Sequence, residues 1–579
     1  MRESATLTGA LAEVFARAGD GPAVVALRDA GPGTAPHTLT YRELDRRARQ
    51  LGAWLAGHRV AGRPVMVALE TGADLAVAVV GCLYAGAVVV PVPPPSASPA
   101  AAERTAAIAR ETGVPVVLTE AGHAADVSRS LSEAGRGGVL CLAVDRPLPE
   151  PAADAAPWEP ARPAPGDVAL IQYTSGTTAA PRGVQVTHAN LLATMAEIRR
   201  ALGTHAGSRI GGWLPCYHDL GLIGQLLHPL WLGATAVLMP PRLFVARPAR
   251  WLEAIDAHGV TVAAAPDSAY ARCAAEVTDA ELAGLDLSRW ECAVNAAEPV
   301  SAATVDAFTA RFAAAGLRPG AMVAGYGLAE ATLLVATGGA GPVRTATGVP
   351  ADGPMPDRRV VSCGPPRGGE VRIVDPADRT ELPEGVEGEV WVRGPAVAAG
   401  YWQRPLETAE VFGAVTAGGA RGFLRTGDLG VLRAGELYLT GRLKDTVVVA
   451  GQSVHPQEME RRLIDCGERL ASAVVFGADE PDRLVVVQEV RHPGRDAGAL
   501  AALAARVRGC LAEEFGATAA GVVLVRPGSV RRTTSGKVRR STMRRLFLDG
   551  ELRPVYAELD AGLDAGLPVP DRPGRVVVP

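Results

Sequence analysis

Residues 171–190 hold the densest group of polar side chains that could bind a polyphosphate. They read Ile-Gln-Tyr-Thr-Ser-Gly-Thr-Thr-Ala-Ala-Pro-Arg-Gly-Val-Gln-Val-Thr-His-Ala-Asn and follow an apolar, strand-like run. Clustered hydroxyls lie on Thr174, Ser175, Thr177 and Thr178. Gly176 and Gly183 would let backbone N–H groups approach a ligand that needs convergent donors. An exposed Ser/Thr loop is an equally good interpretation of this stretch alone, because it lacks the Gly-Lys-Ser/Thr ending of a P-loop.

Five further segments carry chemically capable residues in a fixed order along the chain. They are 213–221 (Trp-Leu-Pro-Cys-Tyr-His-Asp-Leu-Gly), 295–299 (Asn-Ala-Ala-Glu-Pro), 326–332 (Tyr-Gly-Leu-Ala-Glu-Ala-Thr), 425–429 (Arg-Thr-Gly-Asp-Leu) with 441–445 (Gly-Arg-Leu-Lys-Asp), and 534–540 (Thr-Ser-Gly-Lys-Val-Arg-Arg). Carboxylates, a histidine and a lysine near such a loop are the residue types that phosphoryl chemistry uses.

Each of these residues also has an ordinary structural interpretation. An Asp after Thr-Gly, as at Asp428, is usually a turn or cap residue. Tyr326 could be a packing residue, Glu330 a solvated helix residue, and His218 one half of a satisfied buried pair. The basic run 531–545 is most often a solvated face or a nucleic-acid patch. Only the joint order of the segments favours a catalytic site.

Alternating strands and helices are expected to position these segments. Apolar runs at 64–69, 88–92, 114–118, 168–173, 235–239 and 260–264 alternate with Ala-rich helical stretches such as 41–57 and 247–258. This alternation predicts an α/β fold with mostly parallel sheets. The apolar run 75–92 has the length of a membrane helix, but glycines and prolines interrupt it and no basic cluster flanks it. A buried helix leading into a buried strand is predicted there instead.

Two domains are expected. Shorter strands at 370–374, 388–392 and 437–440 predict a β-rich subdomain. Residues 1–443 would thus form a large N-terminal domain of several subdomains. Residues 444–579 would form a small α/β C-terminal domain.

Composition excludes several classes of partner. The 58 basic and 62 acidic side chains give a net charge of −4, so no global field recruits nucleic acid or an anionic membrane. The N-terminus lacks a continuous apolar stretch, so a first amphipathic helix is expected rather than a secretory signal. The 8 cysteines lie far apart in the sequence, without the close pairs of a zinc or redox site. Reduced thiols and a cytoplasmic location are therefore expected.

In their order, the six segments resemble the adenylate-forming superfamily of acyl-CoA synthetases, peptide-synthetase adenylation domains and luciferases. The resemblance spans about residues 39–552. Within that superfamily, four stretches are most similar to the fatty acyl-AMP ligases. They are 81–87 (Gly-Cys-Leu-Tyr-Ala-Gly-Ala), 217–224 (Tyr-His-Asp-Leu-Gly-Leu-Ile-Gly), 326–333 (Tyr-Gly-Leu-Ala-Glu-Ala-Thr-Leu) and 361–364 (Val-Ser-Cys-Gly).

The resemblance implies a two-step ligase that uses ATP and Mg²⁺. A carboxylate oxygen of a fatty or other medium-sized acid attacks the α-phosphorus of ATP, pyrophosphate leaves, and a thiol then intercepts the acyl-AMP. The expected acceptor is the phosphopantetheine thiol of an acyl carrier protein. A CoA ligase and a non-catalytic nucleotide-binding relative remain as alternatives. A nucleic-acid binder is disfavoured, because the basic residues cluster in one short segment without interleaved aromatic residues.

The resemblance also implies a role for each matching residue. Thr174, Ser175, Gly176, Thr177 and Thr178 would cradle the β- and γ-phosphates, and Arg182 would add a fork of donors. Tyr326 would stack on adenine, with Gly327, Ala297 and Glu298 in the same nucleotide site. Glu330 would hold Mg²⁺ through oxygen, Asp428 would accept hydrogen bonds from the ribose hydroxyls, and Arg442 would reach the phosphate or ribose.

Three residues would serve the reaction steps themselves. Lys537 would neutralise charge developing on the α-phosphate and the substrate carboxylate. His218 would gate the acyl tunnel near the carboxylate. Lys444 would be the hinge about which a mobile C-terminal domain rotates between the two steps.

The sequence departs from the family pattern at several positions. Ala179 and Arg182 stand where the family's phosphate loop usually has Gly and Lys, which makes the loop stiffer and replaces a point charge by a planar fork. Asp267 and Ser268 stand where the fatty acyl-AMP ligases usually have Asn and Phe, which puts a charge near the expected acyl pocket. The stretch 338–357, in the place of the insertion that marks those ligases, is short. These departures make the identity of the acid and of the thiol acceptor open questions.

Overall fold

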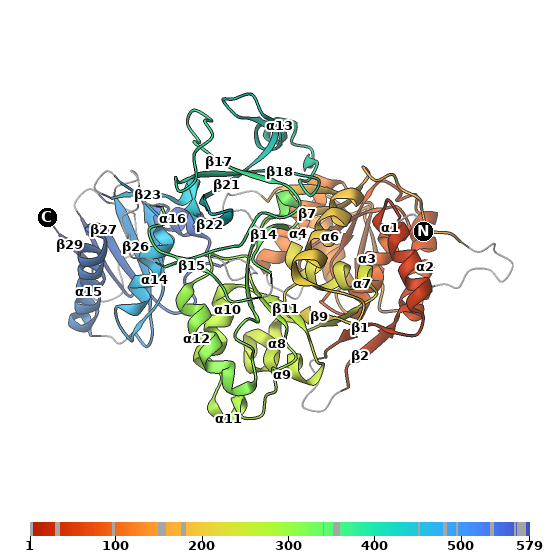
Figure 1. The fold of residues 1–579 in the computed structure, drawn as a ribbon, viewed down its shortest axis with the longest axis horizontal. Helices are drawn as coiled ribbons and strands as arrows, with labels where there is room; N and C mark the ends of the chain where they lie inside the picture. Colours follow the sequence, from red (N-terminus) through yellow and green to blue (C-terminus); the bar gives the residue numbers. More distant parts are fainter. Residues whose placement is uncertain are drawn as a thin grey trace.

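The computed structural model describes residues 4–28, 35–94, 99–148, 158–174, 181–339, 341–350, 359–449, 452–478, 483–493, 496–532, 538–560, 563 and 575–578. Along the chain these residues form two sheets rich in parallel strands, then a β-rich part, then a small C-terminal α/β unit (Figure 1). This architecture confirms the predicted α/β fold class with its β-rich subdomain.

The first sheet consists of eight strands of the described chain. In spatial order they are β14 (Leu334–Thr337), β13 (Met322–Gly327), β12 (Cys292–Asn295), β11 (Val262–Ala265), β9 (Arg209–Gly212), β10 (Thr235–Leu238), β1 (Pro22–Ala26) and β2 (His37–Thr40). The strands from β13 to β1 pair in parallel, and β14 and β2 are antiparallel at the two edges. Helices α8 (Pro241–Ala246), α9 (Ala249–Ala257), α10 (Asp267–Glu276) and α12 (Ala302–Phe312) connect them. Parallel strands present their carboxyl ends at one edge, so the loops after β11, β12 and β13 meet there.

The second sheet packs against the first through a buried helix. Its strands are β19 (Gly400–Tyr401), β8 (Gly183–Thr187), β7 (Val168–Tyr173), β4 (Val88–Pro91), β3 (Pro64–Val67), β5 (Val116–Thr119) and β6 (Leu140–Ala143). Helix α3 (Ala73–Tyr84) is buried along nearly its whole length, and it packs with α1 (Leu7–Ala18) and α2 (Tyr41–Gly57) in one hydrophobic core. A helix that is apolar all round has to be buried. The predicted change from helix to strand within the apolar run 75–92 is confirmed.

The membrane alternative for that run finds no support in the helices themselves. Within the described ranges, no helix combines the length and the apolar character needed to span a bilayer.

The β-rich part is built on one long hairpin. Strand β21 (Arg421–Arg433) pairs with β18 (Gly388–Arg393), β20 (Ala414–Val415) and β22 (Glu436–Arg442), and β17 (Glu370–Val374) pairs with β18. The predicted strands are confirmed in β17, β18 and β22. Strand β21 was not predicted, because Gly422, Gly427 and Gly430 interrupt its apolar pattern.

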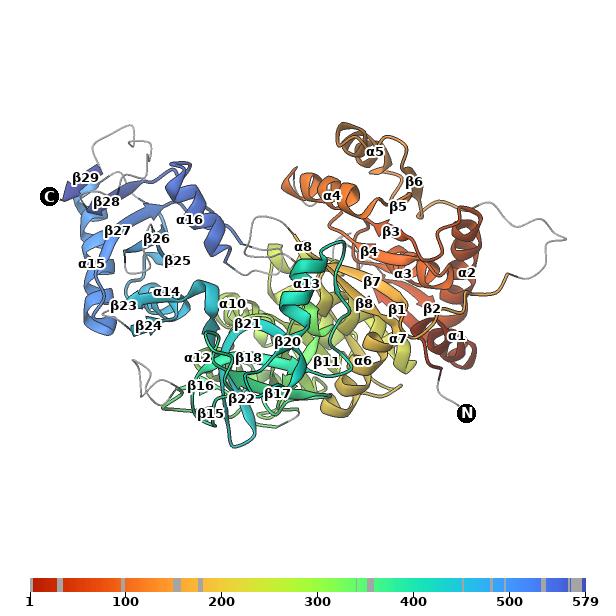
Figure 2. The same cartoon turned by 90° about the horizontal axis from the view of Figure 1, so that it is seen from above.

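The C-terminal unit lies at one end of the molecule, beside the β-rich part (Figure 2). Its sheet contains β25 (Leu470–Gly477), β26 (Leu484–Val490), β27 (Ala519–Val525), β28 (Tyr556–Asp560) and β29 (Arg575–Val578), and a hairpin of β23 (Val447–Val449) and β24 (Gln452–Val454) precedes it. Helices α14 (Pro456–Asp465), α15 (Ala497–Phe515) and α16 (Arg540–Leu548) accompany the sheet. Two buried hydrophobic clusters of its own give this unit a separate core.

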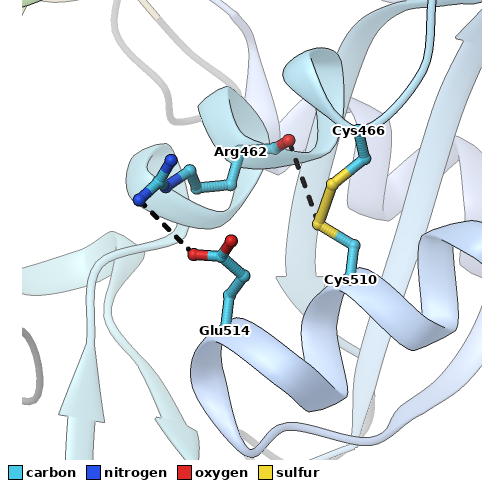
Figure 3. Close-up of a disulfide and its surroundings, with 4 residues drawn as sticks. All are labelled: Arg462, Cys466, Cys510 and Glu514. Atoms are coloured by element: carbon cyan, nitrogen blue, oxygen red, sulfur yellow. Dashed lines mark hydrogen bonds and ion pairs between the residues drawn. A yellow bond between two sulfur atoms is a disulfide. The ribbon is translucent and has the colours of Figure 1, made fainter.

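The prediction that all cysteines are reduced thiols is wrong for one pair. Cys466, directly after α14, forms a disulfide with Cys510 on α15, next to an ion pair of 3.4 Å between Arg462 and Glu514 (Figure 3). The two cysteines are 44 positions apart, but helix packing brings their Cα atoms to 6.6 Å. Sequence spacing did not show this contact, because it arises only from the packing of two separate helices.

Candidate active site

A cavity of about 660 Å³ lies where the two large sheets, the β-rich part and the C-terminal unit meet. This volume is in the range of small-molecule sites. All predicted site residues that the structure describes line it. They are Thr174, Arg182, His218, Ala297, Glu298, Tyr326, Gly327, Glu330, Asp428, Arg442 and Lys444. The remaining predicted residues, Ser175, Gly176, Thr177, Thr178 and Lys537, lie outside the described residues.

The predicted phosphate loop begins and ends at a closed hairpin base. Strands β7 and β8 are antiparallel, and the Thr174 N–H donates to the Arg182 carbonyl at 3.0 Å. Gly183 is required there, since an added Cβ would lie 2.7 Å from Ile171 and 2.9 Å from the Tyr173 ring. Residues 175–180 therefore connect two points fixed at the edge of the cavity. The buried Thr174 Oγ1 has no hydrogen-bond partner in the described structure. It can donate a hydrogen bond to a ligand or accept one from it.

Arg182 is held between an aromatic ring and two carboxylates. Its guanidinium carbon lies 4.5 Å from the centroid of the Tyr401 ring, and its Nη2 lies 3.8 Å from Glu330 Oε1. Its Nη1 lies 3.9 Å from Glu407 Oε2. Both distances are longer than a hydrogen bond. The guanidinium is therefore held in place but keeps N–H donors for a ligand.

Glu330 is fixed by a tyrosine that the sequence motifs did not identify. Glu330 lies in the short helix η4 (Ala329–Ala331), and the Tyr401 hydroxyl donates to its Oε1 at 2.9 Å. Burial, reinforced by the Glu330 charge, raises the pKa of the Tyr401 phenol, so it stays a donor. Tyr401 lies 71 positions from its partner, and only the pairing of β19 with β8 brings it to the site.

The carboxylate of Glu330 fits a magnesium site that a polyphosphate would complete. Across the described ranges, no group of three His, Cys, Asp or Glu side chains could hold a metal ion. Mg²⁺ commonly binds through only one or two carboxylates together with substrate phosphates. A single oxygen donor beside the phosphate-loop base agrees with that mode.

Tyr326, Asp428 and Arg442 form one hydrogen-bonded group across three strands. The Tyr326 hydroxyl donates to Asp428 Oδ2 at 2.7 Å, and Arg442 Nε donates to Oδ1 at 2.6 Å. Burial and the Asp428 charge raise the pKa of the Tyr326 phenol. An ionised carboxylate has about four lone-pair sites, so Asp428 keeps acceptor capacity for further hydroxyls. Gly327 is required next to this group, since an added Cβ would lie 1.7 Å from the Leu333 carbonyl oxygen.

A second buried carboxylate supports the strand that carries Asp428. Glu389 on β18 accepts from Arg425 Nε at 3.0 Å, from the Gly427 N–H at 3.1 Å and from Trp391 Nε1 at 2.9 Å. Two of these contacts hold β21 at Arg425 and Gly427, just before Asp428. Glu389 was not identified from the sequence, because a single Glu in a predicted strand is usually exposed to solvent.

The segment after β12 has a strained backbone at the cavity wall. Ala297 has a positive φ of 71°, which is uncommon for a residue with a side chain. Such conformations persist where the surrounding structure holds them and concentrate at functional sites. Next to it, Glu298 Oε2 accepts from the Ser268 N–H at 2.9 Å, which ties this loop to the start of α10.

Asp267 lines the cavity, but its oxygens are already bound within the protein. Oδ1 accepts from Asn295 Nδ2 at 2.9 Å and from the Ser301 N–H at 3.0 Å, and Oδ2 accepts from Thr304 Oγ1 at 2.9 Å. Burial raises the pKa of this carboxyl and the hydrogen bonds oppose that effect. The unusual acidic residue thus joins the start of α10 to β12 and α12 rather than presenting an unpaired charge to an acyl chain.

His218 lies at the cavity wall beside Asp219. Its Nδ1 is 2.6 Å from Asp219 Oδ1, so the satisfied-pair interpretation holds for one ring nitrogen. Gln172 Nε2 donates to the Tyr217 carbonyl at 2.7 Å and ties this segment to the end of β7. The imidazole is therefore placed near the phosphate-loop base with a fixed orientation.

The C-terminal unit brings positive charge to the same place. Arg532 and Val538, which flank a stretch outside the described residues, form an antiparallel bridge and line the cavity. Burial, together with the nearby Arg539, lowers the pKa of the Arg104 guanidinium. Arg104 in turn donates to the Thr174 carbonyl at 3.1 Å. The residues after Val538 therefore lie near the base of the predicted phosphate loop.

Arg540 connects the C-terminal unit to the predicted hinge. Its Nη1 lies 2.6 Å from Asp445 Oδ2, and its Nη2 lies 2.8 Å from both oxygens of Glu460 on α14. Asp445 ends the short helix η5 (Leu443–Asp445), which also contains the exposed Lys444. All three side chains of this triad are nearly buried. Removing one member of a buried ion pair typically costs about 3–5 kcal/mol, so the triad fixes this end of the unit.

Comparison with known proteins gives consistent similarities over nearly the whole chain. The family model described as AMP-binding enzyme matches residues 11–402. The chain is 36% identical over 559 residues to the medium-chain-fatty-acid–[acyl-carrier-protein] ligase JamA of Moorena producens, covering 92% of this chain and 94% of that protein. It is 33% identical over 565 residues to the 4-hydroxyphenylalkanoate adenylyltransferase of Mycobacterium tuberculosis, covering 92% and 89%.

A solved structure shows the same fold. The fatty acyl-adenylate ligase of L. pneumophila, in complex with acyl adenylate and pyrophosphate, matches with a TM-score of 0.71 and 29% identity, covering 96% of this chain and 98% of that one. The two curated relatives differ in the acid that their names give, so similarity alone leaves the acid open.

Proposed function

Since the chain belongs to the AMP-binding enzymes, and among them to the fatty acyl-AMP ligases, we propose that it activates a fatty or related medium-sized carboxylic acid as acyl-AMP and passes the acyl group to an acyl carrier protein. The protein is an AMP-forming ligase. In the first step a carboxylate oxygen bonds to the α-phosphorus of ATP and the bond to pyrophosphate breaks. In the second step a phosphopantetheine thiol attacks the acyl carbonyl, loses its proton, and AMP leaves.

One observation carries this proposal. The same cavity is lined by the phosphate-loop base at Thr174 and Arg182, by the Tyr326, Asp428 and Arg442 group, and by an apolar wall. A nucleotide and an acyl chain could thus occupy one continuous site with their reacting ends adjacent. Such positioning provides much of the rate enhancement in phosphoryl-type chemistry.

The nucleotide would be bound by residues from both sides of the cavity. Residues 174–178 and Arg182 would bind the leaving pyrophosphate. Tyr326 would pack against adenine while its hydroxyl keeps Asp428 in place. Asp428 would accept the ribose hydroxyls, and Arg442 would lie over the ribose or phosphate. Gly327, Ala297 and Glu298 would shape the adenine side.

Glu330 would hold Mg²⁺ together with the phosphates. The bound ion would supply charge neutralisation on the polyphosphate. The protein's own part is to fix the Glu330 carboxylate through Tyr401 and to keep Arg182 at 3.8 Å from it.

Lys537 would serve the adenylation step and Lys444 the change to the second step. The scarcity of lysine in the chain supports this assignment. Of the 58 basic residues these are the only two lysines, and every other one is arginine. Arginine cannot replace a compact ammonium point charge in every geometry. We assign Lys537 to charge neutralisation during adenylation and Lys444 to the hinge. Residues 444–579 would then rotate as one domain against residues 1–443, in the cytoplasm where ATP and carrier proteins meet.

Acid-dependent release of pyrophosphate tests the proposal. The enzyme would be incubated with ATP, Mg²⁺ and a panel of aliphatic and aryl-aliphatic acids, and pyrophosphate and acyl-AMP would be measured together. The proposal predicts equal amounts of both with at least one acid class. ATP hydrolysis to ADP, or no acid dependence across the panel, would overturn it. Adding CoA or a holo-carrier protein to the active mixture then separates the two thiol acceptors.

A further inference from the structure

One helical segment runs along the acyl side of the cavity. It comprises η2 (Leu220–Leu227), a π-helix, and α7 (His228–Leu232), which continues it. The lining residues recur every four positions, at Leu220, Gly224 and His228, with Gln225 beside them. This spacing places them on one helical face. The cavity therefore follows the segment from His218, near the phosphate-loop base, down to His228.

The spacing also gives the depth of this part of the cavity. A helix rises by about 1.5 Å per residue, so Gln225 and His228 lie roughly 10 and 15 Å beyond the level of His218. A π-helical segment is somewhat shorter per residue, so these values are upper bounds. An extended acyl chain of medium length, with its carboxylate at His218, would end in this region.

Two buried polar atoms at that depth have no hydrogen-bond partner within the described residues. They are Gln225 Oε1 and His228 Nδ1, on side chains that are each only 1% exposed. The other end of each group is fixed. Gln225 Nε2 donates to the Ala264 carbonyl at 3.3 Å, and His228 Nε2 lies 2.8 Å from Thr204 Oγ1.

The wall around these two atoms is otherwise apolar. It is formed by Ile198, Leu202, Ile210, Val262 and Leu333, among others. A buried polar atom without a partner is destabilising, because it has lost its hydrogen bonds to water. A plain alkyl chain would leave both atoms unpaired, whereas a ligand with its own polar end would pair them.

The charge state of His228 limits what that end can be. Burial, with a smaller contribution from the Arg199 charge, lowers the pKa of His228 to about 3. The imidazole is therefore neutral near pH 7. A carboxylate or ammonium end would be buried without a counter-charge from either group, which is unfavourable. A hydroxyl suits both partners in one tautomer, because it can donate to Gln225 Oε1 and accept from His228 Nδ1–H while the Thr204 hydroxyl donates to His228 Nε2.

We infer that the acid activated by this enzyme carries a hydroxyl group at the far end of a medium-length chain, and that Gln225 and His228 bind it. This assignment rests on the proposed acyl-AMP ligase function and names the class of acid for that site. Gln225 and His228 are then specificity-determining residues that do not touch the reacting atoms. Thr204 orients the imidazole.

Matched pairs of acids test the inference directly in the unmodified enzyme. The pairs are octanoate with ω-hydroxyoctanoate and decanoate with ω-hydroxydecanoate, and kcat/KM is measured by pyrophosphate release. A site built to bind a hydroxyl discriminates strongly against the analogue that lacks it, so we expect a preference of at least about tenfold for the hydroxylated acid of the fitting length. Equal kcat/KM values for the two acids of each pair, or a preference for the plain acid in both pairs, would overturn the inference. It would leave the proposed function intact, which fails only if no acid releases pyrophosphate.

Variants show whether these side chains cause the preference. Gln225→Met keeps the side-chain length, and Thr204→Val keeps the shape of the residue that orients His228. Each should reduce the hydroxyl preference towards one while the plain acids are still activated. Leu226→Met, at a buried neighbour on the same helix, is the control and should leave the ratio unchanged. A ratio that stays at the wild-type value in both Gln225→Met and Thr204→Val would contradict the inference.

Binding gives a readout independent of turnover. Two acyl-sulfamoyl adenosines that differ only in the terminal hydroxyl can be titrated by calorimetry. The hydroxylated compound should bind the wild-type enzyme with the lower Kd and lose this advantage in Gln225→Met. Equal Kd values for the two compounds at every chain length would count against the inference.

Discussion

Asp428 and Arg442 face each other directly across β21 and β22, and Arg442 Nε donates to Asp428 Oδ1 at 2.6 Å. The Tyr326 hydroxyl occupies the other carboxylate oxygen. The register of β21 and β22 thus brings Asp428 and Arg442 together, and Tyr326 reaches them from β13 of the eight-stranded sheet. The carboxylate proposed to receive the ribose is held by a cation and a phenol before any nucleotide arrives, so little reorganisation is needed on binding.

Asp428→Asn tests that arrangement. The change removes the charge that Arg442 and the ribose hydroxyls share, and hydrogen bonds to charged groups contribute about 1.5–3 kcal/mol. We therefore expect KM for ATP to rise about 10- to 100-fold in pyrophosphate release assays. Asp20→Asn breaks an exposed pair with Arg42 of similar length, 2.7 Å, and should have little effect. An unchanged KM for ATP in Asp428→Asn would contradict the ribose assignment.

Lys537→Ala should separate nucleotide binding from chemistry. Losing one preorganised donor to developing charge slows a reaction by about 10²–10³-fold. The variant should still bind ATP by calorimetry but form little acyl-AMP. Lys537→Arg, which keeps the charge, measures how much of the effect depends on the compact ammonium. Near-normal pyrophosphate exchange in Lys537→Ala would reject the assignment.

Lys444→Pro should affect the second step more than the first. Proline fixes φ near −65°, which restricts rotation at the proposed hinge. We expect normal acyl-AMP formation and a reduced rate of thioester formation in single-turnover assays. Lys444→Ala, which removes the side chain but leaves φ as free as in the wild type, should transfer normally. If Lys444→Pro lost both steps equally, the hinge role would be wrong.

Chemical labelling of lysines tests the position of Lys537 in the wild-type protein. Because Lys444 and Lys537 are the only lysines, a lysine-selective reagent reports on these two positions. We expect an acyl-adenylate analogue to protect Lys537 in particular, as measured by peptide mass spectrometry. Equal labelling of Lys537 with and without the analogue would contradict its place at the reacting atoms.

Local patterns predicted much of the fold. The helix expected at 41–57 is α2, and the apolar run 75–92 divides into α3 and β4. These elements follow from hydrophobic periodicity and from breakers that lie within the segment itself. Strand β21 was missed because its glycines hide the pattern, although the long hairpin it forms carries Asp428.

The partners of the site residues could not be predicted in the same way. Tyr401 is 71 positions from Glu330, and Tyr326 is 102 positions from Asp428. Such contacts depend on strand order, which a single sequence does not encode locally. Gln225 and His228 were likewise hidden, because polar residues in an apolar helix give no sign of whether they face a cavity.

Two buried histidines predict a loss of stability in acid. Burial lowers the pKa of His188 to about 4 and that of His228 to about 3, while both are near 6.5 in an unfolded chain. Below pH 6.5 the unfolded state binds protons that the folded state does not. The free energy of unfolding therefore decreases as the pH is lowered, by up to about 1.4 kcal/mol per pH unit for each histidine. The unfolding temperature of His188→Gln should fall less steeply between about pH 6.5 and 4.5 than that of the wild type. Parallel curves would contradict the linkage.

The disulfide predicts a more stable C-terminal unit under oxidising conditions. Closing a loop of 44 positions contributes about 4 kcal/mol in the chain-entropy model. Cys466→Ser should lower the unfolding temperature only without reductant, whereas Cys141→Ser, at a free cysteine, should behave alike with and without it. Alkylation of all 8 cysteines in unreduced, denatured protein would contradict the bridge.

The intact mass of a carrier protein tests the central claim most directly. A holo-acyl carrier protein would be incubated with the enzyme, ATP, Mg²⁺ and an active acid, with CoA present in a parallel reaction. We predict that the carrier gains the mass of one acyl group on its phosphopantetheine arm, in proportion to the AMP formed. A carrier of unchanged mass, with the acyl group found only on CoA or not transferred at all, would contradict the account.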